Sequence, residues 1–262
     1  MKKHTILLSF ILSAFLLLNF MEDRKPVLYL IGDSTMADKP LDDNPERGWG
    51  QLLPGFMTDE VLIENHAKNG RSTKSFIDQG LWQEVYDKLH PGDYVFIQFG
   101  HNDSKTEDTS RYAEPHSAYK DNLIKFVMDT RSKGAFPVLL TPVSRRKFDK
   151  TGKLVDSHGD YPVVVREIAQ TLQVPLIDMH QKTLKLLAEL GPEKSKELFE
   201  WVAPNAYKSL PNGKEDNTHF NRTGAIKMAE LAVEGIKELN LPLVKMLKSF
   251  DETSSMGNGK LV

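Results

Sequence analysis

Residues 27–35 read VLYLIGDST, an apolar run that ends in a glycine, an aspartate and two hydroxyl-bearing residues. A short apolar run bordered by Gly and Asp is typical of a buried strand in a parallel sheet, and we place this strand at Val27–Ile31. Four later runs have the same character and predict further strands: Val61–Asn65, Tyr94–Phe99, Pro137–Thr141 and Pro175–Asp178.

Longer amphipathic segments alternate with these runs. They predict helices over Trp49–Met57, Phe76–Leu89, Ala118–Ser132, Tyr161–Leu172, Met179–Leu190 and Arg222–Leu239. Asn221 stands at the N-cap position of the last helix. Strands that alternate with crossover helices predict an α/β fold, a three-layer α/β/α sandwich around a flavodoxin-like five-stranded parallel sheet.

The composition is that of an ordinary globular protein with a substantial core: 262 residues, of which 40% are hydrophobic and 27% charged. We predict one domain over residues 22–250. A formal net charge of -2 argues against a nucleic-acid partner, which needs a basic surface. The chain has no cysteine, which excludes disulfides, thiolate metal sites, a cysteine nucleophile and a lipoprotein anchor.

The two ends of the chain differ from this domain. Lys2 and Lys3 precede an apolar stretch, Ile6–Phe20, that is typical of a secretory signal and short for a membrane span. We therefore predict a signal peptide over residues 1–21, export from the cytoplasm, and no other membrane association. An uncleaved N-terminal anchor is the alternative, since no small-x-small cleavage site is clear. The polar tail, residues 251–262, is predicted to be disordered.

The carboxyl ends of the strands are where a doubly wound sheet binds its ligands. The first three predicted strands run into polar, glycine-containing segments there: Gly32–Ser34, Asn65–Gly70 and Phe99–Asp103. Two long irregular stretches, Asp38–Gly48 and Ser144–Asp160, are predicted to be loops over the same edge, because long ordered loops are usually functional.

Ser34 follows the first strand directly, where its hydroxyl and backbone N–H are exposed at the edge of the sheet. Taken alone, this serine fits a helix N-cap equally well. The Gly-x-Ser-x-Gly elbow of α/β-hydrolases occurs nowhere in the chain, which argues against that fold.

Asp216 and His219 supply the residue types that a serine nucleophile requires. A histidine can take the hydroxyl proton, and a carboxylate can hold that histidine in the right tautomer. Their spacing lets the two side chains meet in one turn of a loop, although a plain surface turn is the alternative. The other histidines lack the His-Glu-x-x-His spacing of metalloproteases, and we expect neither a metal nor an organic cofactor.

Gly70 and Asn102 are candidates for stabilising the negative charge that ester hydrolysis builds on an oxygen. Gly70 lets its backbone approach a ligand closely, and Asn102 offers a side-chain amide. Each also fits a simple turn residue. Together with Ser34, Asp216 and His219, however, they form one consistent site.

These residues stand in the order of four known sequence blocks: Gly32-Asp33-Ser34, Gly70, Gly100-His101-Asn102-Asp103 and Asp216-x-x-His219. In the order and spacing of these blocks, the chain resembles the SGNH (GDSL) hydrolases. Further matches over residues 27 to 237 resemble the rhamnogalacturonan acetylesterase branch: Gly32–Met36, Gly48–Gln51, Asn65–Phe76, Phe99–Asp103, Thr141–Arg145 and Asp216–Asn221.

The resemblance implies an acetylesterase that works through an acetyl-serine without a cofactor. Ser34 would be the nucleophile, His219 the general base and Asp216 its orienting carboxylate. The backbone N–H groups of Ser34 and Gly70 and the side chain of Asn102 would form the oxyanion hole. Fungal members carry disulfides, so a chain without cysteine suggests a bacterial form that is periplasmic or extracellular.

The implied substrate is an acetylated plant polysaccharide, rhamnogalacturonan, whose galacturonates carry carboxylates. Cationic side chains near the site are candidates for binding them: Arg71, Lys74, Arg145 and Arg146. Trp49 and Trp201 are candidates for stacking on sugars. Solvated surface charge and buried core aromatics are the alternatives.

The sequence leaves three other functions open. A xylan acetylesterase would share the chemistry, and a broad lipase or thioesterase would need an apolar acyl channel. A non-catalytic carbohydrate-binding protein is the alternative from another class. The sequence gives no indication of an oligomeric state.

Overall fold

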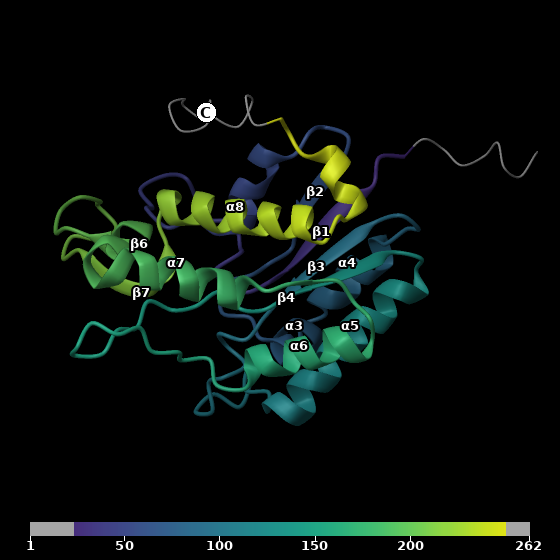
Figure 1. Cartoon of the computed structure of the whole chain (residues 1–262), viewed down its shortest axis with the longest axis horizontal. Helices are drawn as coiled ribbons and strands as arrows, with labels where there is room; N and C mark the ends of the chain where they lie inside the picture. The colour runs from purple at the N-terminus through teal and green to yellow at the C-terminus, as the bar shows by residue number, and fades with distance from the viewer. Residues whose placement is uncertain (1–23, 250–262) are drawn as a thin grey trace, which may run out of the picture.

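The computed structural model describes residues 24–249 (Figure 1). The predicted signal peptide, residues 1–21, and the predicted disordered tail, residues 251–262, lie outside the described residues. No helix within 24–249 is long and apolar enough to cross a membrane.

Five parallel strands form the central sheet, in the order β2-β1-β3-β4-β5. They are β1 (Val27–Gly32), β2 (Leu62–Asn65), β3 (Tyr94–Gln98), β4 (Phe136–Leu140) and β5 (Leu176–Ile177). In register, Leu30 of β1 lies between Asn65 of β2 and Phe96 of β3. The order changes direction beside β1, so the carboxyl ends of β1, β2 and β3 meet at the switch point. The predicted fold is confirmed, with strand ends shifted by a residue or two.

Helices cover both faces of the sheet (Figure 1). One layer holds α3 (Thr73–Asp78), α4 (Leu81–Lys88), α5 (Lys120–Ser132) and α6 (Tyr161–Thr171). The π-helical turn η2 (Pro115–Tyr119) leads directly into α5. The other holds α2 (Trp49–Leu52), α7 (Met179–Lys194) and α8 (Arg222–Glu238), with the 3-10 turns η1 (Leu53–Phe56), η3 (Ser195–Leu198) and η4 (Pro242–Met246).

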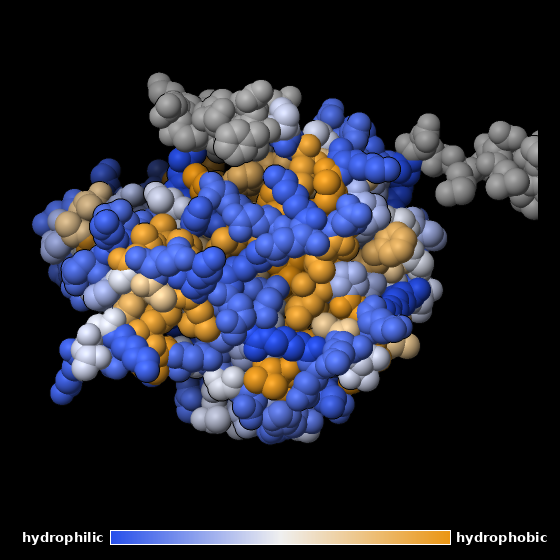
Figure 2. Space-filling view, in the orientation of Figure 1, coloured by the Kyte–Doolittle hydropathy of each residue, from blue (hydrophilic) through white to orange (hydrophobic). Residues whose placement is uncertain are grey.

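The strands divide the core between the two layers because successive side chains point to opposite faces. On β1, Leu28 and Leu30 pack in the cluster that contains α8, whereas Tyr29 and Ile31 pack with α5 and α6. On the face seen in Figure 2 the outer surfaces of the helices are mainly hydrophilic, and hydrophobic residues show between the layers.

Two predicted helices are interrupted. The helix expected over Phe76–Leu89 is α3 followed by α4, because Gly80 adopts a left-handed φ of 75° that ends one helix before the next begins. The helix expected over Trp49–Met57 continues beyond α2 only as the 3-10 turn η1, which contains Pro54. The last predicted helix is confirmed: the Asn221 side chain accepts from the Gly224 N–H and caps α8.

A second sheet was not predicted. It pairs β6 (Phe199–Val202) with β7 (Lys214–Phe220), antiparallel. The pairing is irregular. Phe199 pairs with Phe220 and Trp201 pairs with Glu215, so a single residue between these pairs on β6 lies opposite four residues on β7. The extra residues leave the ladder as a bulge, Asp216–His219, which we call the β7 bulge.

Candidate active site

Ser34 lies in the turn that follows β1. The N–H groups of Met36 and Ala37 both donate to the Asp33 carbonyl, at 3.2 and 3.1 Å, and this closes the turn around the serine. No helix follows directly, since α2 begins only at Trp49. The helix N-cap alternative for Ser34 is therefore wrong.

The Ser34 hydroxyl lies in hydrogen-bond contact with His219. Its Oγ is 2.9 Å from His219 Nε2, and His219 Nδ1 is 2.7 Å from Asp216 Oδ2. Ser34 is 9% exposed, so it is enclosed but still open to solvent. The structure thus brings the three predicted residues into one line in which the histidine can exchange a proton with the hydroxyl.

The β7 bulge explains how Asp216 and His219 meet although they lie in a strand. In a regular strand, residues three apart point to opposite faces. Here the Asp216 Oδ1 atom accepts the backbone N–H groups of Thr218 and His219, at 2.7 and 2.9 Å, and folds the segment back on itself. The predicted contact between the Asp216 and His219 side chains is confirmed, but it forms in a strand bulge and not in a loop turn.

The electrostatics around His219 stabilise a positive charge on its ring. Burial lowers the pKa of His219, but its hydrogen bond to Asp216, with the nearby Glu46 carboxylate, outweighs this and raises the pKa above the ordinary value. Burial raises the pKa of Asp216, and its hydrogen bonds from His219 outweigh that effect, so this pKa lies well below the usual range. An imidazolium that forms at His219 is therefore stabilised.

Gly70 follows β2 and Asn102 follows β3, the two strands that flank β1. The Asn102 Nδ2 group donates to the Arg71 carbonyl at 2.9 Å, which fixes the amide plane and leaves its second N–H for another acceptor. Gly70 has a left-handed φ of 73°, a conformation that L side chains rarely adopt, which explains a glycine at this position.

A hollow of about 310 Å³ opens beside this edge of the sheet. We call it the β2 hollow. Its polar lining consists of Asp38, Asn65, Lys68, Asn69 and Arg71. It therefore offers two cationic side chains, two amides and one carboxylate to a polar ligand. Arg71, one of the predicted substrate-binding residues, lies in it.

Two of the other predicted cations already have hydrogen-bond partners in this chain. Lys74 pairs with Asp78 of its own helix at 2.6 Å. The Arg145 Nη2 group donates to the His101 carbonyl at 3.1 Å, next to Asn102.

Arg146 is buried, and every nitrogen of its guanidinium donates to the protein. Nε donates to Ser195 Oγ at 3.0 Å, Nη1 to Asn217 Oδ1 at 2.7 Å, and Nη2 to the Pro192 carbonyl. The Asn217 carbonyl also accepts the Arg146 backbone N–H at 2.8 Å. We conclude that Arg146 holds the β7 bulge in place, with three of its five N–H donors bonded inside the protein.

The two tryptophans have different environments. Trp49 is fully buried and donates to Gln98 Oε1 at 2.8 Å, so the prediction that it stacks on a sugar is wrong; its apolar ring packs in the core. Trp201 is half-buried, and its ring faces Arg146 and Lys196, whose cationic groups lie 5.1 and 4.6 Å from the ring centre.

Sequence reasoning missed an ion pair beside His219. Lys39, with its side chain 1% exposed, lies 2.6 Å from Glu46, and both belong to the predicted Asp38–Gly48 loop. Glu46 also forms a bridge with Asn221, directly after the β7 bulge. The loop was correctly expected at this edge, but no spacing in the sequence pointed to these two residues.

A buried pair of histidines in contact with each other, which sequence reasoning also missed, begins at Asp33 in the turn that carries Ser34. Asp33 accepts the Thr35 N–H and lies 3.0 Å from His101 Nδ1, and His101 Nε2 lies 3.3 Å from His158 Nε2. Burial lowers the pKa of His158 to about 3, so this ring is neutral. His101 stood in a quoted sequence block, whereas nothing in the sequence connected it with His158.

Comparison with known proteins gives consistent matches. A family model described as the GDSL-like Lipase/Acylhydrolase family matches residues 30–225. Rhamnogalacturonan acetylesterase RhgT of Bacillus subtilis strain 168 is 44% identical over 227 residues, which cover 86% of this chain and 96% of that protein. Probable rhamnogalacturonan acetylesterase YesY of the same strain is 36% identical over 84% of this chain and 96% of its own length.

Solved structures share the fold. Protein YxiM of Bacillus subtilis superposes with a TM-score of 0.71 at 26% identity, covering 84% of this chain and 58% of that one. Axe2, an acetylxylan esterase from Geobacillus stearothermophilus, has a TM-score of 0.55 at 15% identity over 83% of this chain and 95% of its own. At that identity the second similarity speaks for the fold alone.

Proposed function

Since the chain belongs to the GDSL-like lipase/acylhydrolase family, we propose that it is an exported acetylesterase that removes acetyl groups from acetylated rhamnogalacturonan. The ester hydrolase chemistry follows from the family. One observation carries the proposal: a hydrogen-bonded Ser34–His219–Asp216 line in a chain that aligns with 96% of a rhamnogalacturonan acetylesterase.

The reaction proceeds in two acyl-transfer steps. His219 Nε2 takes the hydroxyl proton as Ser34 Oγ attacks the acetyl carbonyl, and the sugar oxygen leaves with that proton. Water then attacks the acetyl-serine, His219 removes a water proton, and acetate departs as Ser34 regains its hydrogen. Asp216 stays ionised and keeps Nδ1 protonated, so that Nε2 remains the base.

The developing oxyanion needs fixed donors. The backbone N–H groups of Ser34 and Gly70 and the free N–H of Asn102 Nδ2 are assigned this role. Removing one such donor costs about 3–4 kcal/mol of transition-state stabilisation in serine hydrolases. Because the Arg71 carbonyl already orients the Asn102 amide, little reorganisation is needed when charge appears.

The test of the chemistry is Ser34→Ala. The variant should lose nearly all activity on a chromogenic acetate ester while its thermal midpoint stays near that of the wild type. Full activity would sink the assignment. Binding of polysaccharide without turnover by the wild type would favour the carbohydrate-binding alternative.

The substrate class rests on the polarity of the β2 hollow and on the named relatives. Galacturonate carboxylates can pair with Lys68 and Arg71 in this hollow. An apolar acyl channel, which a broad lipase or thioesterase requires, does not match this lining. We expect hydrolysis to fall steeply from acetate to decanoate esters.

A matched pair of variants tests the role of the hollow. Lys68→Ala should raise KM for acetylated rhamnogalacturonan and leave hydrolysis of a small chromogenic acetate unchanged. Lys74→Ala, at a lysine already paired with Asp78, is the control and should change neither. Equal or faster acetate release from acetylated xylan would remove the rhamnogalacturonan assignment without touching the esterase chemistry.

Export is a separate part of the proposal and rests on the sequence of residues 1–21 alone. The mature protein isolated from culture medium or periplasm should start near Glu22. Intact mass spectrometry would detect a retained N-terminus, which supports the anchor alternative.

A further inference from the structure

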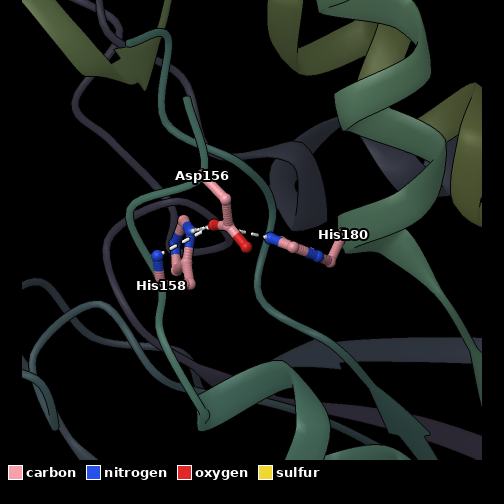
Figure 3. Close-up of side chains that lie close together, drawn as sticks. All are labelled: Asp156, His158 and His180. Carbon is pink, nitrogen blue, oxygen red and sulfur yellow. Dashed lines mark hydrogen bonds and ion pairs between the residues drawn. The ribbon is translucent and has the colours of Figure 1, made fainter. Parts of the chain in front are cut away.

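A second cluster of ligand-type side chains lies away from Ser34, where the Ser144–Asp160 loop meets the start of α7. Asp156 and His158 come from the loop and His180 from the helix, and Figure 3 shows the two rings on either side of the carboxylate. One nitrogen or oxygen atom from each lies within 4.8 Å of the others. The histidine side chains are 1% and 3% exposed, whereas Asp156 is 45% exposed.

Hydrogen bonding fixes the tautomer of His158. Asp33 is a carboxylate and only accepts, so His101 Nδ1 carries the proton that they share at 3.0 Å. His101 Nε2 is then a bare lone pair. It lies 3.3 Å from His158 Nε2, which must therefore carry the hydrogen of that bond. In neutral His158 the other nitrogen, Nδ1, is consequently a bare lone pair.

That lone pair has no hydrogen-bond partner among the described residues, although it is buried. The atom it faces, Asp156 Oδ1, is 3.7 Å away and is also an acceptor. Two acceptors directed at each other, one of them on a buried ring, are unfavourable unless something positive lies between them. The arrangement suits a bound cation.

We propose that Asp156, His158 and His180 bind a divalent transition-metal ion of the zinc class. At Zn–N and Zn–O lengths of about 2.0–2.1 Å, tetrahedral ligands lie about 3.3 Å apart. The observed separations from Asp156 Oδ1, 3.7 Å to His158 Nδ1 and 3.1 Å to His180 Nε2, lie on either side of this value. Two imidazoles and a carboxylate favour zinc over calcium or magnesium, which prefer oxygen ligands.

Ligation by His180 Nε2 requires the ring proton on Nδ1, which lies 3.3 Å from Arg166 Nη2. Arg166 has two shorter bonds, to Asp178 at 2.8 and 3.1 Å. The contact to His180 is the longest of the three and is the one that opens when the metal binds.

The hydrogen bonds behind His158 support the site. A metal-bound histidine normally donates its other ring N–H to a fixed acceptor, and His158 donates to His101, which in turn is held by Asp33. The ion would thus join the Ser144–Asp160 loop to α7 and, through His101, to the turn that carries Ser34. It touches no reacting atom, so its role is structural.

One other group among the described residues has metal-ligand spacing: Glu46, Glu200 and His219. Lysines already neutralise both of its carboxylates, since Lys39 lies 2.6 Å from Glu46 and Lys214 lies 2.5 Å from Glu200. This group has no unpartnered lone pair and is not proposed as a site.

The test uses the full chain without added histidines, stripped with a chelator and titrated with ZnCl₂ in a calorimeter. We expect one zinc per chain. At about 100 times Kd, zinc should raise Tm by roughly 5–10 °C. Calcium and magnesium should do neither. Cobalt(II) should give the visible absorption bands of a four-coordinate site.

Variants decide where zinc binds. Asp156→Asn, at a half-exposed position that tolerates an amide, should weaken zinc binding at least 10-fold and abolish the Tm shift, and His180→Gln should do the same. His116→Gln is the matched control: this histidine forms an exposed pair with Asp160 at 3.0 Å and should leave binding unchanged.

Two results would overturn the proposal. One is the absence of any heat or Tm shift with zinc in the wild type. The other is zinc binding that survives Asp156→Asn and His180→Gln but is lost in His219→Asn, which would place the ion at the catalytic histidine.

Discussion

Replacing Arg146 by methionine removes the guanidinium that holds the β7 bulge while keeping a side chain of similar length and an apolar stem. In the wild type this group donates to Ser195, to Asn217 of the bulge and to the Pro192 carbonyl. The sequence suggested a different role, binding of a substrate carboxylate. The two roles predict different outcomes for the same substitution.

The magnitude follows from the three lost bonds. A hydrogen bond to a charged donor contributes about 1.5–3 kcal/mol, and such contributions are not additive. Methionine removes a charged donor from each of three acceptors, one of which, Asn217, lies in the β7 bulge beside His219. We therefore expect a loss of about 3–5 kcal/mol in the free energy of unfolding, comparable to breaking a buried ion pair. For a chain of this size that lowers Tm by roughly 6–20 °C.

Activity should fall as well, and on every substrate alike. A loosened bulge misplaces the His219 imidazole, so kcat should drop about 10–100-fold on a chromogenic acetate and on the polysaccharide. KM for the polysaccharide should stay near the wild-type value. Thermal denaturation and steady-state kinetics on both substrates measure these quantities.

Arg131→Met is the matched control. The Arg131 guanidinium also donates to backbone carbonyls, Leu172 at 2.8 Å and Gln173 at 3.2 Å, but it is exposed and far along the chain from the bulge. It should cost about 1 kcal/mol or less and leave kcat unchanged. The reasoning fails if Arg146→Met keeps wild-type Tm and kcat but raises KM for the charged polymer alone, because that is the pattern of a substrate-binding residue.

Three further substitutions test the electrostatics of the site. Asn102→Ala should lower kcat about 100- to 1000-fold with KM nearly unchanged, since it removes an oxyanion donor; a tenfold rise in KM at normal kcat would contradict this. Burial raises the pKa of Asp103 to about 7 although Thr73 donates to it, so the protein loses stability as the pH rises from about 4 through 7. Asp103→Asn should flatten that dependence, as followed by Tm against pH, and an unchanged slope would count against it. Glu46→Gln removes a charge that raises the pKa of His219, so the acid limb of kcat/KM should move to lower pH, and a move to higher pH would refute the assignment.

Much of the fold could be predicted because its signals are local. Buried parallel strands are short apolar runs, and all five predicted runs lie in the observed sheet. The break at Gly80 and the 3-10 continuation after α2 were missed, since an isolated glycine or proline within an amphipathic pattern does not decide by itself whether a helix ends. The β6–β7 pair was missed because β6 is only four residues long and β7 is a polar run without apolar alternation.

The residues of the site likewise fall into those that the sequence could predict and those that it could not. Ser34, Asp216 and His219 were predicted from residue type and spacing, and the structure brings them into hydrogen-bond contact. The roles of Arg146 and Trp49 were not predictable: a charged or aromatic residue near a site reads the same in sequence whether it faces the ligand or the interior.

The sequence alone determined which side chains are available for the chemistry and the α/β order that brings the strand ends to one edge, because both depend on local pattern and chain connectivity. Only the tertiary structure decided how the β7 bulge turns Asp216 toward His219, that Arg146 holds this bulge, and that His158 is left with an unpartnered lone pair beside Asp156. These features depend on contacts between residues far apart in the chain, which no local pattern records.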